Sequence, residues 1–163
     1  MDELRHDCVS GRQVNRDQEL FEYGSGNSTM FFAGRVGSVI SVETDPKWYD
    51  YFVDKVPENV TLLPGFPFDR QTYSRIIDKQ NKKFDVVVVD AEERNDCLFN
   101  VESSLSDRGV VILDDTQGPV TEPGIRHLLD RGFKRLDFEG LKPGGIRAYR
   151  TTVFYKSGNC FGI

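Results

Sequence analysis

The feature that constrains the fold most is a run of four consecutive valines, Val86–Val89, flanked by Phe84-Asp85 and by Asp90. A β-branched run without polar alternation is typical of a strand in the middle of a parallel sheet, where helices cover both faces. The run is also far shorter than the roughly 18 apolar residues that a membrane span needs. No stretch of that length occurs elsewhere in the sequence. We therefore expect an α/β fold and no membrane association.

Strand-like and helix-like segments alternate along the chain, which predicts a Rossmann-like doubly wound sheet of about seven strands. The last two strands have no helix between them, only a glycine-rich loop over Glu139–Arg150, so we expect an antiparallel strand at the C-terminal end. The predicted strands are Leu20–Tyr23, Ser38–Glu43, Val60–Leu63, Phe84–Asp90, Gly109–Asp114, Lys134–Phe138 and Thr151–Tyr155. The predicted helices are Ser28–Arg35, Pro46–Lys55, Asp69–Lys79, Asn95–Leu105 and Glu122–Arg131.

Size and charge narrow the class of protein. The 163 residues fit one domain, which we place at residues 20–163 after a short N-terminal segment, 1–19. A net charge of -5 argues against a nucleic-acid partner, because such partners need clustered Lys and Arg. The N-terminus has no apolar core of a secretory signal. Cys8, Cys97 and Cys160 match neither a disulfide framework nor a zinc pattern, so we expect reduced thiols and a cytoplasmic location.

A glycine loop follows the first predicted strand. In Glu22-Tyr-Gly24-Ser-Gly26-Asn-Ser-Thr29 the two glycines stand between a strand and a helix, where the backbone must turn sharply and can approach a ligand closely. Free N–H groups at the start of the helix then face whatever lies over the loop. Taken alone, the motif is equally consistent with an ordinary tight turn.

An acid at the end of the next strand adds to this pattern. Glu43 follows Gly24 by 19 residues, which is where dinucleotide-binding folds place a carboxylate for the ribose hydroxyls. Glu43 could instead be an acid at the start of the helix that begins at Pro46, although Asp45 is better placed to cap it. Together, the glycines and the acid favour a cofactor that contains a nucleoside. The third glycine of the NAD motif is absent, and Thr29 stands in its place.

The segment Glu22–Thr29 resembles motif I of class I S-adenosylmethionine-dependent methyltransferases, an acid followed by x-Gly-x-Gly. The resemblance continues through Val42–Asp45, Phe84–Asp90 and Gly109–Asp115 to the last two strands. It implies that Glu22, Gly24 and Gly26 contact the methionine end of S-adenosylmethionine and that Glu43 binds the ribose. Ser28 departs from the third glycine of many members. Cofactor-binding residues by this resemblance are Glu22, Gly24, Ser25, Gly26, Ser28, Thr29, Glu43, Thr44, Gly65 and Asp90, with Thr44 and the Leu63–Phe66 segment beside the adenine.

Three carboxylates end the fourth and fifth predicted strands and should face the same crevice. Asp90-Ala91 and Asp114-Asp115 resemble the metal-binding pairs of the catechol O-methyltransferase group, which implies a divalent cation such as Mg²⁺ at Asp90, Asp114 and Asp115. Against this, the continuation Glu92–Arg94 does not match that group. Acids after strands are also common loop starters or helix caps. A role of Asp90 toward the substrate without a metal is the other interpretation.

The predicted activity is methyl transfer from S-adenosylmethionine to a small-molecule or glycan-type acceptor, at oxygen or nitrogen. Asp90 and Asp115 are the candidates for a general base, which a hydroxyl acceptor needs. Arg94, Gln117 and the loop Gly140–Tyr149 are candidates for the acceptor side. Two alternatives stay open: a catalytically silent S-adenosylmethionine-binding module, and an NAD-dependent oxidoreductase. The sequence leaves the acceptor and a homo-oligomer undecided.

Overall fold

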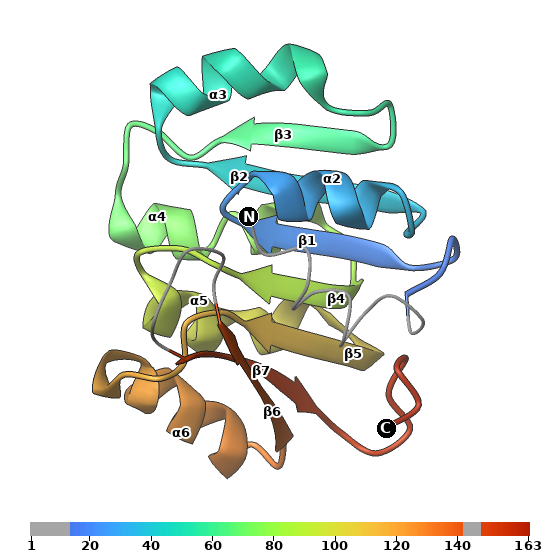
Figure 1. Cartoon of the computed structure of the whole chain (residues 1–163), viewed down its shortest axis with the longest axis vertical. Coiled ribbons are helices and arrows are strands. Elements are labelled where there is room, and N and C mark those ends of the chain that lie inside the picture. Colours follow the sequence, from blue (N-terminus) through green and yellow to red (C-terminus); the bar gives the residue numbers. More distant parts are fainter. Residues whose placement is uncertain (1–13, 142–147) are drawn as a thin grey trace.

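The computed structural model describes residues 14–141 and 148–163, and in them a seven-stranded sheet has the order β3-β2-β1-β4-β5-β7-β6 (Figure 1). Strands β1 to β5 are parallel, and β7 runs antiparallel to both β5 and β6. The predicted fold class is therefore confirmed. The strands are β1 (Glu19–Tyr23), β2 (Ser38–Glu43), β3 (Val60–Pro64), β4 (Phe84–Val89), β5 (Leu105–Leu113), β6 (Lys134–Leu141) and β7 (Ala148–Tyr155).

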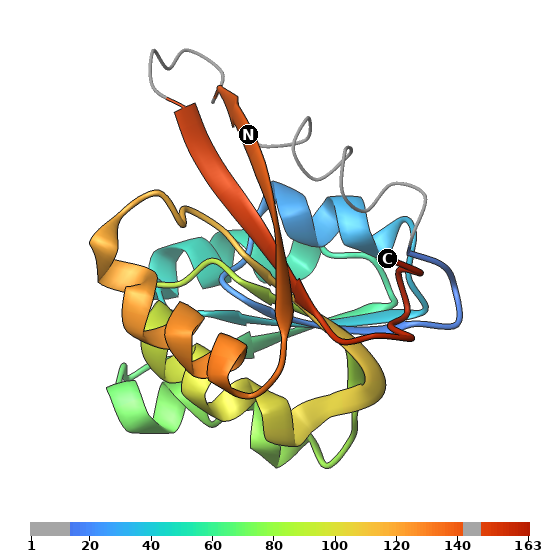
Figure 2. The ribbon, with the colours of Figure 1, turned by 90° about the horizontal axis from the view of Figure 1, so that it is seen from below.

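Helices cover both faces of the sheet. Figure 2 shows α2 and α3 on one face and α4, α5 and α6 on the other. The α-helices are α2 (Asn27–Ala33), α3 (Pro46–Phe52), α4 (Arg70–Ser74), α5 (Arg94–Asn100) and α6 (Glu122–Asp130). The 3-10 helices are η1 (Val53–Lys55), η2 (Ile77–Gln80), η3 (Val101–Ser104) and η4 (Pro119–Thr121). No helix in residues 14–141 and 148–163 has both the length and the apolar character to cross a membrane.

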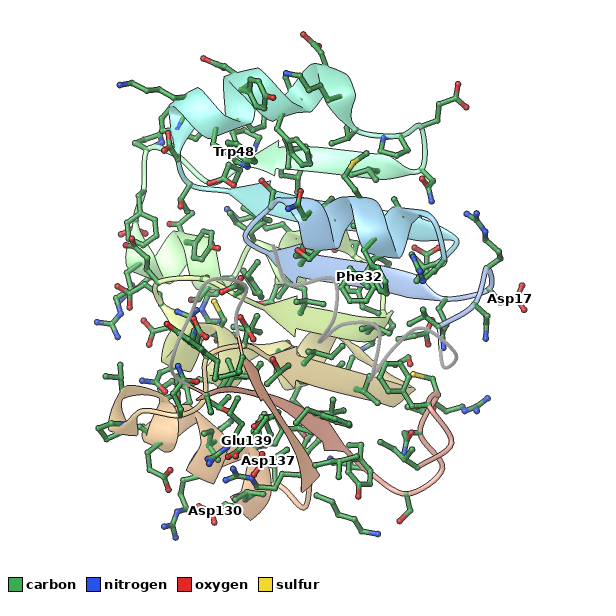
Figure 3. All side chains as sticks on the ribbon, in the orientation of Figure 1. Asp17, Phe32, Trp48, Asp130, Asp137 and Glu139 are labelled. Carbon is green, nitrogen blue, oxygen red and sulfur yellow. The ribbon has the colours of Figure 1, made fainter. Side chains whose placement is uncertain are left out.

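The valine run explains why the sheet is covered twice. Val86 and Val88 pack into a core with Phe32 of α2, whereas Val87 and Val89 pack into a second core with Leu98 of α5. Successive side chains of a strand point to opposite faces, so a strand that buries every residue needs a layer on each side. All four valines are at most 1% exposed. Figure 3 shows Phe32 below α2 in this view, beside β1.

Two predicted helices are shorter than the sequence pattern suggested. The stretch Asp69–Lys79 forms α4 over only five residues and then the 3-10 turn η2, because the backbone leaves the helical region at Arg75. The stretch Asn95–Leu105 ends as η3, and Leu105 already belongs to β5. Both helices therefore cover less of the sheet than regular helices of the predicted length would.

The start of β5 corrects a second boundary. Gly109 does not begin the strand: Leu105 already pairs with Phe84, and the register shifts before Val110 pairs with Val86. A Cβ on Gly109 would lie 2.8 Å from the Leu105 side chain and 3.0 Å from the Phe84 carbonyl oxygen. The glycine therefore marks an irregularity within the strand, which is a common place for glycine in sheets.

The last two strands form a hairpin that extends beyond the sheet. β6 pairs with β7 from Lys134 to Leu141, whereas β5 pairs only with Thr152–Phe154. Figure 2 shows the outer part of this hairpin projecting past the helices. Both strands are thus three residues longer than predicted. Cys97 and Cys160 are free thiols, as expected, and Cys8 lies outside the described residues.

Candidate cofactor and acceptor site

The predicted site residues gather where the parallel strands end. Because β1 to β5 are parallel, their carboxyl ends share one edge of the sheet, to which β1–β4 point in Figure 1. Backbone hydrogen bonds join neighbouring strand ends at this edge. Gly24 N–H donates to the Val42 carbonyl at 2.9 Å, and Asp90 N–H donates to the Tyr23 carbonyl at 3.0 Å. Ligands of doubly wound folds bind at this edge.

Gly24 occupies a position that excludes any side chain. Its φ of 98° lies in the region that L-residues rarely adopt. A Cβ there would lie 2.4 Å from the carbonyl oxygen of Asp90. The glycine thus allows the loop after β1 to touch the end of β4. Gly26 differs, because a Cβ there would meet no atom of residues 14–141 and 148–163 within 4 Å. Open space therefore lies over Gly26, where a ligand can approach the backbone.

Glu22 lies beneath this loop, not in the crevice. Its side chain is 1% exposed, and its two carboxylate oxygens accept hydrogen bonds from Ser28 and Thr29, each at 2.5 Å. The Ser41 hydroxyl lies 2.9 Å from Glu22 Oε2 and 2.7 Å from the Gly24 carbonyl oxygen. Thr29 Oγ1 also accepts the Gly26 N–H at 2.9 Å. The carboxylate assigned to the methionine end therefore holds the glycine loop from below.

Burial has the largest effect on the pKa of the Glu22 side chain. Removal from water raises the pKa of Glu22 to about 7, against the hydrogen bonds from Ser28, Thr29 and Ser41, which lower it. The negative charge of Asp90 raises this pKa further. Near neutral pH the side chain is therefore partly protonated. A protonated carboxyl also donates a hydrogen bond, which matters in a cluster where one Ser41 hydroxyl faces two acceptors.

Glu43 joins the glycine loop to the turn before α3. Its Oε2 accepts a hydrogen bond from Ser25 Oγ at 2.5 Å, and its Oε1 accepts the Asp45 N–H at 2.8 Å. Asp45 is the N-cap of α3, since it accepts the N–H groups of Lys47 and Trp48. Glu43 is therefore not the capping acid, which removes the simpler explanation for a carboxylate at this position.

Trp48 adds a further hydrogen bond to the loop that Glu43 contacts, and the sequence did not indicate this residue. Its indole Nε1 donates to the Ser25 carbonyl at 3.2 Å, while its ring stacks on Phe52 with centroids 5.6 Å apart. Figure 3 shows Trp48 at the start of α3, beside the ends of β2 and β3. Ser41 was missed as well. A serine at an inward position of an otherwise apolar strand was the available signal for it.

The segment after β3 packs directly onto Glu43 and Thr44. Gly65 N–H donates to the Glu43 carbonyl at 2.6 Å, and a Cβ on Gly65 would lie 3.2 Å from Thr44 Cγ2. A cavity of about 510 Å³ begins here, and its lining combines this segment with α4 and η2. Its walls are Leu63, Pro64, Gly65, Phe66, Pro67, Asp69, Thr72, Tyr73, Ile76, Lys79 and Gln80. The two segments predicted to lie near the adenine are thus adjacent.

The three carboxylates predicted to hold a metal do not converge on one point. Asp114 is 5% exposed and accepts a hydrogen bond from Thr151 Oγ1 at 2.5 Å. The guanidinium of Arg94 lies between the other two, with Nη2 2.7 Å from Asp90 Oδ1 and 3.9 Å from Asp115 Oδ2. Over residues 14–141 and 148–163, no group of three or more His, Cys, Asp or Glu side chains is arranged to hold a metal ion. These residues do not fit the predicted Mg²⁺ site.

A smaller cavity, of about 220 Å³, lies next to Arg94. It is lined by Arg70, Glu92, Glu93, Arg94, Asn95, Asp115, Val120 and Thr121. Asp115 has a φ of 58°, in the left-handed region. Gln117, predicted to reach the acceptor, accepts the Arg150 N–H at 3.0 Å. Most of the Gly140–Tyr149 loop, residues 142–147, lies outside the described residues.

Comparisons with known proteins bear on the fold. No family model and no curated protein matches the sequence. Among solved structures, the N-methyltransferase NodS of Bradyrhizobium japonicum superposes with a TM-score of 0.70 at 13% identity, covering 95% of this chain and 96% of its own. The precorrin-6y C5,15-methyltransferase of Geobacter metallireducens gives 0.68 at 16% identity, covering 94% and 88%. The O-methyltransferase TomG of Streptomyces achromogenes, solved with S-adenosylmethionine, gives 0.68 at 16% identity, covering 94% and 78%.

These likenesses extend over 94–95% of the chain. At identities of 13–16% they establish the fold alone. The fold is that of the class I S-adenosylmethionine-dependent methyltransferases, as the resemblance of the sequence implied.

Proposed function

From this shared fold and the geometry of the glycine loop, we propose that the chain transfers a methyl group from S-adenosylmethionine to a small-molecule or glycan-type acceptor, at oxygen or nitrogen. The observation that carries the proposal is the linkage of two cofactor elements through Ser25. Its hydroxyl donates a hydrogen bond to Glu43 at the end of β2, Gly24 lets the loop pack against the end of β4, and Gly26 leaves the backbone accessible. A tight turn alone would need neither the buried acid nor the link to Glu43.

The residues around this loop fit the two ends of the cofactor. The backbone of Gly24–Gly26 would hold the methionine end, with Glu22, Ser28 and Thr29 keeping the loop in place from below. Glu43 would accept the ribose hydroxyls, and charged acceptors make strong hydrogen bonds. The adenine would lie against Thr44 and Gly65, at the edge of the larger cavity. This assignment is supported by the open space over Gly26 and the partial exposure of Thr44.

Methyl transfer requires mainly that the protein align the acceptor atom with the methyl group and the sulfur. When bound, S-adenosylmethionine supplies a methyl group on a positively charged sulfur. The protein would hold the acceptor in line with that group, which is a positioning effect. A hydroxyl acceptor also has to lose a proton, and Asp90 and Asp115 are the carboxylates at the crevice that would receive it. A neutral amine does not need this help before it attacks.

The proposal is tested by thermal unfolding with S-adenosylhomocysteine, the demethylated product. At 100 times the dissociation constant a ligand adds about 2.7 kcal/mol of stability. For a domain of this size we expect the melting temperature to rise by about 5–10 °C. NADH at the same concentration should leave it unchanged. A rise with NADH and none with S-adenosylhomocysteine would reject methyl transfer in favour of an oxidoreductase.

Binding and turnover are separated in a second step. Protein is incubated with S-adenosylmethionine labelled in its methyl group and with a small-molecule extract that contains sugars and amines. Label appearing in the extract with wild type, and much less of it with Asp90→Asn, supports an enzyme with Asp90 at the acceptor. Strong binding with no transfer to any fraction would indicate a silent binding module.

A further inference from the structure

One guanidinium links the ends of β4 and β5. Arg94, at the start of α5, has Nη2 2.7 Å from Asp90 Oδ1 and 3.9 Å from Asp115 Oδ2. Its Nε donates to the Asp114 carbonyl at 3.1 Å, and its Nη1 donates to the Ala91 carbonyl at 2.5 Å. The side chain is only 21% exposed. It therefore contacts two carboxylates and two backbone carbonyls that belong to two different loops.

We propose that Arg94 is a positioning residue that supplies, from the chain itself, the positive charge between Asp90 and Asp115 that a bound divalent cation would otherwise supply. Carboxylates gathered at strand ends repel each other unless a cation compensates them. A divalent cation would need several oxygens around one point. Here the guanidinium occupies the place between the carboxylates, and Asp114, the third acid, is directed to Thr151.

The shape of the side chain matters as well as its charge. A guanidinium offers five N–H donors in a rigid plane, whereas the ammonium of lysine is a compact charge on a flexible chain. Arg94 makes three hydrogen bonds, one from each of its three nitrogens, and Nη2 also forms an ion pair with Asp115 at 3.9 Å. Arginine thus fixes the distance between the loops after β4 and β5, and with it the positions of Asp90 and Asp115. Lysine would supply the charge without this set of directions.

A second arginine nearby provides a matched control. Arg70 also has two acidic partners, Glu93 at 2.9 Å and Asp96. Unlike Arg94 it is 58% exposed, and these two acidic partners both lie in the stretch around the start of α5. Replacing either arginine with methionine removes one charge and keeps much of the apolar length. Only the Arg94 change removes side-chain contacts that join the loops after β4 and β5.

The inference is tested by Mn²⁺ binding, followed by electron paramagnetic resonance, and by thermal unfolding with and without Mg²⁺. Wild type should bind no Mn²⁺ at millimolar concentration and should melt at the same temperature in Mg²⁺ and in EDTA. Arg94→Met should melt about 3–8 °C lower, because buried acceptors lose a charged partner. It should also gain Mn²⁺ binding that disappears when Asp90→Asn is added. Arg70→Met should change the melting temperature by less than about 2 °C.

Two results would overturn the inference. One is stoichiometric Mn²⁺ binding by wild type that Asp90→Asn abolishes. The other is an Arg94→Met protein that melts like Arg70→Met and gains no Mn²⁺ binding. If Arg94→Met does not fold, Arg94→Lys replaces it, with a smaller drop in melting temperature and no Mn²⁺ binding expected. None of these measurements involves S-adenosylmethionine, so the inference fails or stands separately from the proposed function.

Discussion

The two halves of the crevice are built differently. In the half formed by β1 and β2, the acids are buried, with Glu22 1% and Glu43 8% exposed, and they accept hydrogen bonds from hydroxyls and a backbone N–H group. In the half formed by β4 and β5, the side chain of Asp90 is 52% exposed and an arginine is its partner. The first half therefore has a fixed shape suited to one ligand. The second half is more exposed at Asp90, and the ion pairs of Arg94 hold its two loops together.

The glycine loop allows the strongest test of the first half. Gly24→Ala should reduce the free energy of unfolding by about 2–4 kcal/mol, because its Cβ would be strained and would clash with the Asp90 carbonyl. Affinity for S-adenosylhomocysteine should fall at least about 100-fold, which is about 2.7 kcal/mol. Chemical denaturation and calorimetry measure the two effects.

Gly26→Ala is the matched variant, because within the described part of the chain its Cβ would have no neighbouring atom within 4 Å. We expect stability within about 0.5 kcal/mol of wild type. Affinity should still fall by about 10-fold if the ligand lies over the loop. Unchanged affinity for this variant would place the ligand elsewhere.

Glu22 should make stability depend on pH in an unusual direction. Burial raises the pKa of Glu22 from its ordinary value of 4.5 to about 7, so the stability that the protonated side chain contributes is fully present below about pH 4.5 and is lost as pH rises through 7. Between pH 5 and pH 8, wild type should lose roughly 2–3 kcal/mol relative to Glu22→Gln. Urea unfolding at a series of pH values measures this difference.

The control for Glu22 lies on the same strand. Partial burial acts to raise the pKa of Glu19, but Lys82 and Ser38 outweigh it, and the pKa is lowered. Glu19→Gln should therefore show no loss of this kind between pH 5 and pH 8. A flat difference between wild type and Glu22→Gln over the same range would contradict the burial account.

Glu43 distinguishes ribose binding from helix capping. Glu43→Gln should weaken S-adenosylhomocysteine binding by about 10- to 100-fold, since a charged acceptor is worth about 1.5–3 kcal/mol. Asp45→Asn, at the N-cap of α3, should leave affinity within about 3-fold, because asparagine caps helices as well as aspartate. Calorimetry of both variants checks this. Equal losses in the two would mean that Glu43 acts only on the turn.

Substitution of Trp48 should have the smallest effect on ligand affinity, and its fluorescence reports binding directly. Trp48→Phe loses the indole N–H bond to the Ser25 carbonyl and should weaken S-adenosylhomocysteine binding about 3- to 10-fold. Tyr51→Phe, beside it on α3, should change affinity by less than about 2-fold. Since Trp48 is the single tryptophan of the chain, its fluorescence should change on ligand addition to wild type. No change in fluorescence and no loss of affinity would remove Trp48 from the site.

Much of the fold was predictable because its signals are local. The Val86–Val89 run and the alternation of strands and helices led to the sheet, and the spacing of Gly24 and Glu43 located the first half of the crevice. What the sequence did not show depends on contacts between distant residues. Arg94 between Asp90 and Asp115, and Thr151 on Asp114, come from segments whose proximity no local pattern encodes. The metal hypothesis rested on the number of carboxylates at the strand ends. The side chains that pair with these carboxylates cannot be identified from the sequence.

The most direct measurement is a calorimetric titration of S-adenosylhomocysteine into wild type. The proposed function predicts saturable binding of one ligand per chain, weakened in Gly26→Ala and Glu43→Gln while both variants remain folded. No heat of binding with folded wild type would contradict it. Binding that survives both substitutions unchanged would show that the glycine loop and Glu43 are not the cofactor site.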